Sequence, residues 1–287
     1  MRIKSLLFCI VLFAVVTITI AQRRGDSFPR GRSFRQDMPF MPGSQPLRSD
    51  FPTWEIEPGF EDDVFTFVRI EYESPGAMNM IEGWDNDYPD ADWNFSYRLQ
   101  QLTSLNVSPE TKHIRLTDPT LADYPFIYMS GVQRMRLNTP EKTAMRKYLL
   151  NGGFVMMSDF WNPEGWANVH NQMRGVFPDR EPVELTLDHP IFHLIFDLKE
   201  LPQIVDIHTW MGGDSFEYYH GPTDGDVAPH FWSYFDDNGR MVALLCHNND
   251  LGDGWEREGE NKDYFLENSE KHSYPMGINI VMYVLTN

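Results

Sequence analysis

The chain has 287 residues, with 24 Lys or Arg against 42 Asp or Glu, so its formal net charge is −18 at pH 7. Hydrophobic residues make up 41% and aromatic residues 14%, which excludes a disordered chain. The length suits one large domain or two small ones. The acidic balance argues against nucleic acid as a partner, because binding to phosphate backbones rests on clustered Lys and Arg.

The segment 1–21 has the pattern of a secretory signal peptide. Arg2 and Lys4 precede an uncharged apolar run over 5–20, and the small residue Ala21 stands at the expected cleavage point. The run is short for a membrane-spanning helix, although retention as an anchor stays open. We therefore expect export to the periplasm or extracellular space, and a soluble mature protein without a transmembrane span. Cleavage removes Cys9 and leaves Cys246 without an internal disulfide partner.

Residues 22–59 are rich in Arg, Pro, Gly and Ser and show neither a helical nor a strand period. Such a composition is typical of a flexible linker. We therefore predict one folded domain over 60–287. The apolar run 64–70 predicts its first buried strand, and 93–105 predicts a helix with Phe95, Leu99 and Leu102 on the inner face.

The next strand, helix and strand have clear boundaries. Residues 125–130 predict a buried strand, Thr139 is the expected N-cap of a helix that ends at 151–153, and 154–157 predict another strand. The short connections predict a parallel pair, with Phe126 and Val155 in neighbouring strands.

The remaining pattern is less regular. A helix is expected over 162–174, ended by Gly175, and a last helix from 273. Strands are expected at 204–208, 215–219, 230–234 and 241–246. Together the elements predict an open, mostly parallel α/β sheet with helices on both faces and extra β hairpins in the C-terminal half.

Several phrases occur together in this chain: PFIYMSG (125–131), KYLLNGGFVMMSD (147–159), VFPDR (176–180), LDHPIFH (187–193) and MGINIVMYVL (276–285). With them the chain resembles the bacterial domain of unknown function 4159 family, from Val64 onward. The resemblance implies a flavodoxin-like fold, divergently related to class I glutamine amidotransferases and trehalose-utilisation (ThuA-like) proteins. It implies no particular reaction.

The nucleophile of an amidotransferase is missing from the expected place. Such an enzyme needs a Cys at a tight turn after a strand, whereas 154–157 lead into Ser158 and Asp159. Cys246 ends a different apolar strand and is expected to be a small core residue. We therefore predict no catalytic residue of this kind.

Histidines suggest a metal site only weakly. His189 and His193 are four residues apart, a spacing found in zinc ligands on one helix face, but Pro190 places His189 at or before a helix cap. We predict a turn there, no metal site and no cofactor. A calcium site from Asp250 and Asp253 stays an alternative, although the spacing is not that of an EF-hand.

Polar and aromatic residues follow the predicted strands at their carboxyl ends, where open α/β sheets bind ligands. Indole faces beside Asn and Asp suit a sugar or another small polar ligand, and a well-packed turn is the competing interpretation. The candidate ligand-binding residues are Ser130, Gly131, Ser158, Asp159, Trp161, Trp166, Asn249, Asp250 and Trp255.

The sequence therefore predicts a non-catalytic module that binds a small polar ligand, a sugar being one option, or another protein. The alternative is a hydrolase that uses Asp159, Asp250 or a dispersed His as general acid or base. A third hypothesis is a structural partner within an envelope assembly, which would expose an apolar patch.

Overall fold

The computed structural model describes residues 52–56, 58–59, 63–75 and 83–287. The predicted signal peptide and most of the predicted linker lie outside these residues. Leu47–Asn287 forms one compact unit. Trp54, near the end of the predicted linker, packs within this unit: its indole Nε1 donates to the Val107 carbonyl at 2.7 Å, and its ring lies 5.8 Å from that of Tyr97.

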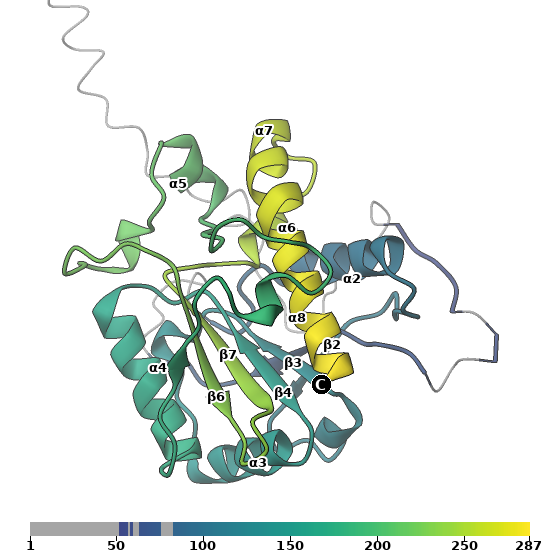
Figure 1. The fold of residues 1–287 in the computed structure, drawn as a ribbon, viewed down its shortest axis with the longest axis vertical. Helices are drawn as coiled ribbons and strands as arrows, with labels where there is room; N and C mark the ends of the chain where they lie inside the picture. Colours follow the sequence, from purple (N-terminus) through teal and green to yellow (C-terminus); the bar gives the residue numbers. More distant parts are fainter. Residues whose placement is uncertain (1–51, 57, 60–62, 76–82) are drawn as a thin grey trace, which may run out of the picture. The chain divides into compact units, whose positions relative to one another are not determined.

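The described residues form one sheet with the strand order β2-β1-β3-β4-β7-β6-β5 (Figure 1). The pairs from β2 to β7 are parallel, whereas β6 and β5 pair antiparallel at one edge. This arrangement confirms the predicted open, mostly parallel α/β sheet. The strands are β1 (Val68–Glu71), β2 (Lys112–Arg115), β3 (Phe126–Met129), β4 (Phe154–Met157), β5 (Val183–Glu184), β6 (His230–Phe235) and β7 (Met241–His247).

The central strand pair has the predicted direction. Phe126 pairs with Phe154 and Ile127 with Val155 in parallel register, and α3 (Thr139–Leu150) connects the two strands. All residues of both strands are buried, which explains their continuous apolar sequences.

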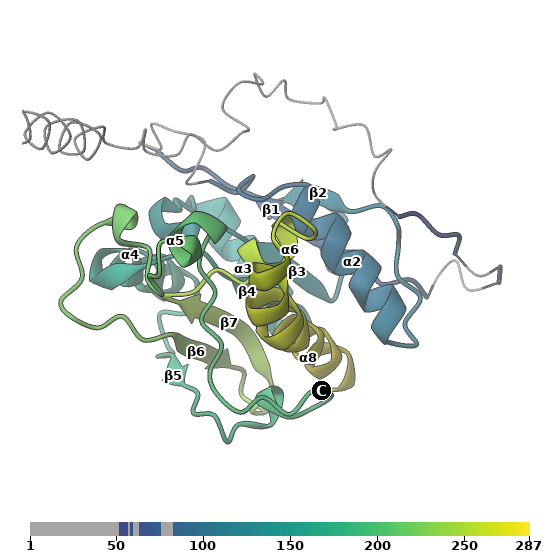
Figure 2. The same cartoon turned by 90° about the horizontal axis from the view of Figure 1, so that it is seen from above.

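Helices cover both faces of the sheet (Figures 1 and 2). Residues alternate between the faces along each strand. In β3, Phe126 and Tyr128 pack with residues of α2 (Asp90–Leu102) and α8 (Tyr274–Thr286). The intervening Ile127 and Met129 pack with residues of α3 and α4 (Asn162–Val176).

Several predicted helix boundaries were wrong by a few residues. The N-cap of α3 is Asn138, not Thr139, because the Asn138 side chain accepts from the Glu141 N–H in a capping box. Helix α4 passes through Gly175 and ends at Val176. Leu102, expected on the inner face of α2, is 52% exposed.

The segments 204–208 and 215–219 are not strands. Ile204 donates its N–H to the Asn249 side chain at 2.8 Å. A side-chain oxygen therefore accepts the hydrogen bond that a backbone carbonyl of a neighbouring strand would accept in a β-sheet. Asp206 caps the short helix α5 (Ile207–Met211), and Phe216 packs edge-on against Trp161. The apolar residues of these segments are thus buried by loop packing.

Short helical segments complete the described chain. A π-helical segment, η7, leads directly into α8. The segments are η3 (Leu121–Asp123), η4 (Val132–Arg134), η5 (Pro190–Phe192), η6 (Tyr218–His220), α6 (Asp253–Glu256), α7 (Lys262–Tyr264) and η7 (Phe265–Ser273). Within the described ranges, no helix combines the length and the apolar content that crossing a membrane requires.

Candidate functional site

The loops after β3, β4 and β7 lie at one edge of the sheet, because these strands are parallel neighbours. The loops after β4 and β7 are tied together: Asp159 donates its N–H to the Asn249 carbonyl at 3.0 Å, and Asn248 donates to the Phe160 carbonyl at 2.9 Å. A single bridge between Phe160 and Asn249 marks this junction. The edge is therefore a defined structure rather than a set of separate turns.

Left-handed backbone is concentrated at this edge. Among the described residues, the non-glycine residues with positive φ are Asp87 (61°), Asp159 (57°), Asn162 (60°) and Asn248 (54°). Asp and Asn accept this conformation more readily than other side-chain-bearing residues. Three of the four directly follow β4 or β7 or open α4, so they turn the chain sharply where the strands end.

Five carboxylates and one imidazole converge beneath these loops, and we call them the acidic cluster. Each member is at most 6% exposed. They come from segments far apart in the sequence, including the loop after β1 and the 217–220 segment. The members of the acidic cluster are Asp87, Asp159, Glu217, His220, Asp250 and Asp253.

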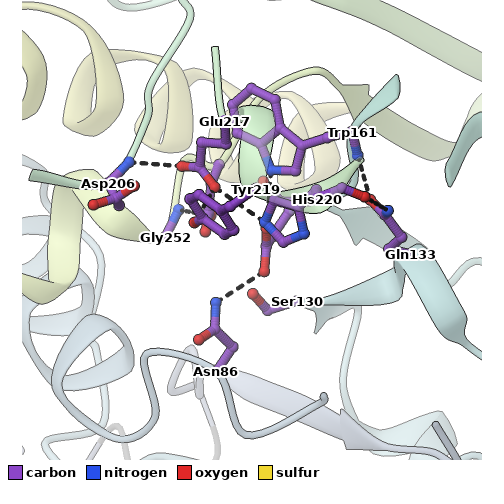
Figure 3. A network of polar contacts seen from close by, with 12 residues as sticks. Asn86, Ser130, Gln133, Trp161, Asp206, Glu217, Tyr219, His220 and Gly252 are labelled. Carbon is purple, nitrogen blue, oxygen red and sulfur yellow. Dashed lines mark hydrogen bonds and ion pairs between the residues drawn. The ribbon is translucent and has the colours of Figure 1, made fainter. Parts of the chain in front are cut away.

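One half of the cluster is built around His220 (Figure 3). His220 Nε2 lies 3.1 Å from Glu217 Oε2 and 3.8 Å from Asp159 Oδ1. The ring of His220 also stacks on the Trp161 indole, with an interplanar angle of 12°. An acid, a base and a second acid therefore meet within a buried space.

Hydrogen-bond donors fix the two carboxylates beside His220. Asn86 Nδ2 donates to Asp159 Oδ2 at 2.8 Å and Trp161 Nε1 donates to Asp159 Oδ1 at 3.1 Å. The Asp206 N–H donates to Glu217 Oε1 at 2.7 Å, and the Tyr219 hydroxyl donates to Glu217 Oε2. Such contacts orient the carboxylates without neutralising them.

The other half of the cluster surrounds Gly252. A Cβ at this position would lie 2.8 Å from Tyr128 Oη, 2.9 Å from Asp87 Oδ2 and 3.0 Å from Asp250 Oδ1. Oxygen atoms of Asp87, Asp253 and Glu256 also lie within 4.8 Å of one another. Only a glycine leaves room for these oxygens to approach so closely.

Two buried hydroxyl groups at this edge make no hydrogen bond of good geometry within the described residues, although they interact with one another: burial raises the pKa of the Tyr128 hydroxyl, and the Ser130 side chain opposes this rise. They are Tyr128 Oη at the end of β3 and Ser130 Oγ just after it, and both residues are 0% exposed. Buried hydroxyl groups are usually paired, so an orphaned pair next to an acidic cluster marks a place for a polar partner.

Burial and neighbouring carboxylates shift the pKa values of several acids in the cluster. Burial raises the pKa of Asp250 well above its ordinary value, and the carboxylate of Asp159 raises it further. Burial likewise raises the pKa of Asp253, with Asp250 as the next cause. Burial raises the pKa of Glu217, against the opposing hydrogen bond from His220. The cluster therefore favours an added proton or an added cation.

The structure brings some sequence-predicted residues to the cluster and uses others for packing. Asp159 and Asp250 are members, and Ser130 lies near them after β3 (Figure 3). Gly131, in contrast, opens η4 and packs against the backbone of Gly83. Ser158 Oγ accepts from the Leu251 N–H at 3.1 Å, and Asn249 Nδ2 donates to the Pro202 carbonyl at 2.8 Å. Ser158 and Asn249 thus close the loops, as the packed-turn interpretation expected.

The three predicted tryptophans do not present free faces. Trp161 and Trp255 are 0% exposed. Trp255 is covered by Phe95, with ring centroids 4.4 Å apart, while the half-buried Trp166 stacks on His170 and contacts Trp232. The expectation of an open aromatic platform for a sugar was therefore wrong.

The histidines considered for zinc have other partners. His189 Nδ1 accepts from the Ile191 N–H as the cap of η5, and His193 Nδ1 contacts Asp197 at 2.6 Å. Neither residue belongs to a group of potential metal ligands within the described chain. Such groups do form from Asp159, Glu217 and His220, and from Asp87, Asp253 and Glu256.

Sequence reasoning missed Asp87, Glu217 and His220. The acid and the imidazole of Glu217 and His220 are three residues apart, a spacing that brings side chains together on a helical turn. Because 215–219 was predicted as a strand, in which residues three apart point to opposite faces, this spacing was not recognised. Cys246 is fully buried in the apolar core, and burial raises the pKa of its thiol.

The fold and the site together define an α/β protein with an acidic, buried cluster at the carboxyl edge of a mostly parallel sheet. The model of one family, described as domain of unknown function (DUF4159), matches residues 66–285. The chain belongs to this family, as the resemblance in its sequence indicated. A comparison with curated proteins finds no match.

Proposed function

We propose that this family member is an exported α/β domain that binds a small polar ligand at the acidic cluster. The observation that carries the proposal is the convergence of buried carboxylates with two orphaned hydroxyl groups, Tyr128 Oη and Ser130 Oγ, at the carboxyl edge of the sheet. A folded core gains nothing from buried hydroxyl groups that lack well-formed hydrogen bonds.

The chemistry of the site favours a ligand rich in hydrogen-bond donors or positive charge. Ionised carboxylates only accept hydrogen bonds, so hydroxyl and amino groups are suitable partners. A sugar remains within this class, but its recognition would rest on hydroxyl groups rather than on stacking, since Trp161 and Trp255 are buried. Amino sugars and small amines fit the same description.

Thermal unfolding of the purified protein with a panel of sugars, amino sugars and amines tests the proposal. A ligand present at a hundredfold of its Kd adds about 2.7 kcal/mol to the stability of the folded state. The shift should disappear in Ser130→Ala and persist in Asp214→Asn, a change at an exposed carboxylate. A panel without effect, together with capture of an envelope protein, would favour the protein-interaction alternative.

A hydrolase is the second candidate, favoured by the contact of Glu217 with His220. Two titratable groups within hydrogen-bond reach can exchange a proton with a substrate, and burial raises the pKa of Glu217 above its ordinary value. Hydrolysis of chromogenic glycosides or esters that is lost in Glu217→Gln would support it. Binding of the same compounds without turnover would contradict it.

We also propose that the fold has a flavodoxin-like origin, shared with class I glutamine amidotransferases and ThuA-like proteins. The parallel strands follow the order β2-β1-β3-β4-β7, which corresponds to the flavodoxin order 2-1-3-4-5. The order reverses between β1 and β3, beside Ser130. An experimental structure with left-handed crossovers between these strands would contradict the shared origin.

Export is the third part of the proposal and rests on the composition of 1–21. Fractionation of producing cells should place the protein outside the cytoplasm, with a mature chain that begins near Gln22. A full-length chain that starts at Met1 and stays in the cytoplasm would contradict export.

A further inference from the structure

Three atoms of the acidic cluster are spaced like the donors of a bound metal ion. One ligand atom each from Asp159, Glu217 and His220 lies within 4.8 Å of the others. His220 Nε2 is 3.1 Å from Glu217 Oε2 and 3.8 Å from Asp159 Oδ1. Ligands bound at roughly 2.0–2.1 Å to a tetrahedral ion are about 3.4 Å apart. The 3.8 Å contact is too long for a hydrogen bond, so hydrogen bonding alone does not explain the group.

The surroundings of the three residues resemble the outer contacts of a metal centre. Each carboxylate is oriented by neutral donors: Asn86 and Trp161 for Asp159, and the Asp206 N–H for Glu217. Hydrogen bonds of this kind hold metal-binding side chains in position. The nearby Arg69 is bonded to Asp92.

An independent observation points to a ligand at the same place. Ser130 Oγ is fully buried and makes no hydrogen bond of good geometry within the described residues, where its side chain interacts with the Tyr128 hydroxyl. Figure 3 shows its side chain directed at the space between Asn86 and His220. A hydroxyl group in this position can contact a metal-bound water or the oxygen of a polar ligand. The orphaned hydroxyl and the acidic group thus share one space.

We infer that Asp159, Glu217 and His220 bind one divalent transition-metal ion, with Zn²⁺ as the best match to an imidazole and two carboxylates. Two carboxylates and an imidazole supply the oxygen and nitrogen donors that such an ion takes. Three protein ligands would leave one position of a tetrahedral ion open for a water molecule or a polar ligand. The inference deepens the proposed function and rests on it, because the ion holds the polar ligand at its open position.

The test measures metal content and affinity on the purified protein. After dialysis against Zn²⁺ and removal of free ion, elemental analysis should give one Zn²⁺ per chain, and calorimetric titration should give the same stoichiometry. His220→Gln and Asp159→Asn should each weaken Zn²⁺ binding at least tenfold. Circular dichroism of the metal-free variants shows whether they remain folded, and Glu217→Gln provides a third variant if one of them does not.

The chain offers a matched control at its surface. His230 contacts Glu184 at 2.5 Å and Asp226 at 2.9 Å, so it also joins an imidazole to two carboxylates, but both acids are half exposed or nearly so. His230→Gln should leave the stoichiometry and affinity unchanged. Loss of Zn²⁺ in His230→Gln with retention in His220→Gln would overturn the inference. So would failure of the unaltered protein to bind Zn²⁺, or equally tight binding of Ca²⁺ and Mg²⁺.

Repeating the ligand panel with a chelator separates this inference from the proposed function. A polar ligand that binds equally well with and without chelator, to a protein that takes up no Zn²⁺, would overturn the metal site and leave the proposed function standing. If the protein binds one Zn²⁺ per chain but no compound of the panel, the result would support the metal site and count against the proposed function. Ligand binding that requires Zn²⁺ supports both.

Discussion

Arg69 and Asp92 form an ion pair with no exposed surface, in which Arg69 Nε lies 3.1 Å from each carboxylate oxygen. Arg69 Nη1 also donates to the Trp84 carbonyl at 3.0 Å and to the Asn86 carbonyl. The guanidinium therefore joins β1, α2 and the 84–87 loop that carries Asp87. These hydrogen bonds direct the guanidinium to Asp92. Against the effect of burial, Asp92 raises the pKa of Arg69, and the charge of Asp87 in the acidic cluster contributes less to this rise.

Removal of one partner of this pair should be strongly destabilising. Arg69→Met leaves the Asp92 carboxylate buried without a counter-ion, and such changes lower the free energy of unfolding by about 3–5 kcal/mol. The double variant Arg69→Met with Asp92→Leu should recover much of the loss, because an apolar pair leaves no buried charge. Urea unfolding of the three proteins measures the coupling. Additive losses in the double variant would contradict a direct pair.

Neutralising Asp250 should stabilise the metal-free protein near neutral pH. An acid whose pKa is raised in the folded state contributes stability at low pH, and this contribution is lost as the pH rises through the raised value. Asp250→Asn keeps an oxygen for the Gly252 N–H, which now donates to Asp250 Oδ1 at 2.8 Å. In chelator, the variant should therefore be the more stable protein at pH 7 to 8.

The difference between Asp250→Asn and the unaltered protein should shrink as the pH falls toward 4, since the aspartate is then protonated in the folded protein. Thermal unfolding across this pH range measures the trend. The exposed Asp214→Asn serves as the control and should follow the unaltered protein at every pH. A variant that is less stable throughout would show that the Asp250 charge is compensated in the folded state.

The central part of the fold could be predicted because its signals are local. The buried runs 126–129 and 154–157 are apolar on both faces, and the Asn-Gly-Gly sequence ends the helix between them. The short connections then require the parallel pairing of Ile127 with Val155 that the structure has. Strand β2 was missed, because Lys112–Arg115 is an exposed edge strand with no apolar pattern.

The candidate site was only partly predictable for a related reason. Asp159 and Asp250 each follow a buried strand that the sequence shows as an apolar run. The end of that run was enough to place both residues at the edge of the sheet. Glu217 and His220 reach the cluster through a loop whose position depends on contacts with distant segments, such as the Asn162 Nδ2 bond to the His220 carbonyl at 3.0 Å. A short stretch of sequence carries no information about such contacts, so its apolar residues were taken for a strand.

His247 should make the protein sensitive to acid. Burial lowers the pKa of His247 to about 4, with its hydrogen bond to the Asn162 carbonyl as an opposing influence. A group whose pKa is lowered on folding contributes stability above its unfolded pKa of about 6.5 and loses it as the pH falls through the folded value. About 3 kcal/mol should therefore be lost between pH 6.5 and 4.

Unfolding titrations of His247→Gln against pH measure this contribution. The variant should lose less stability between pH 6.5 and 4 than the unaltered protein, because Gln takes up no proton in the unfolded chain. His208→Gln, a change at an exposed histidine, should lose as much stability between pH 6.5 and 4 as the unaltered protein does. If all three proteins lose the same stability over this pH range, groups other than His247 cause the sensitivity to acid.

Two glycine substitutions should have opposite effects, because one glycine lies in the cluster and the other lies on a helix surface. Gly252→Ala places a Cβ within 3.0 Å of oxygen atoms of Tyr128, Asp87 and Asp250, and overpacking of this kind costs about 1–3 kcal/mol. Gly175→Ala lies in α4, where the Cβ meets only the flexible end of Lys142, so improved helix propensity should add up to about 1 kcal/mol.

Thermal unfolding of both alanine variants measures the contrast, and ligand or Zn²⁺ titration shows whether it extends to the site. Gly252→Ala should also weaken ligand binding, since its methyl group occupies the space in which the cluster oxygens meet, whereas Gly175→Ala should bind as the unaltered protein does. A Gly252→Ala protein of unchanged stability would mean that the loop after β7 moves away without cost. The close approach of Tyr128, Asp87 and Asp250 would then not depend on the glycine.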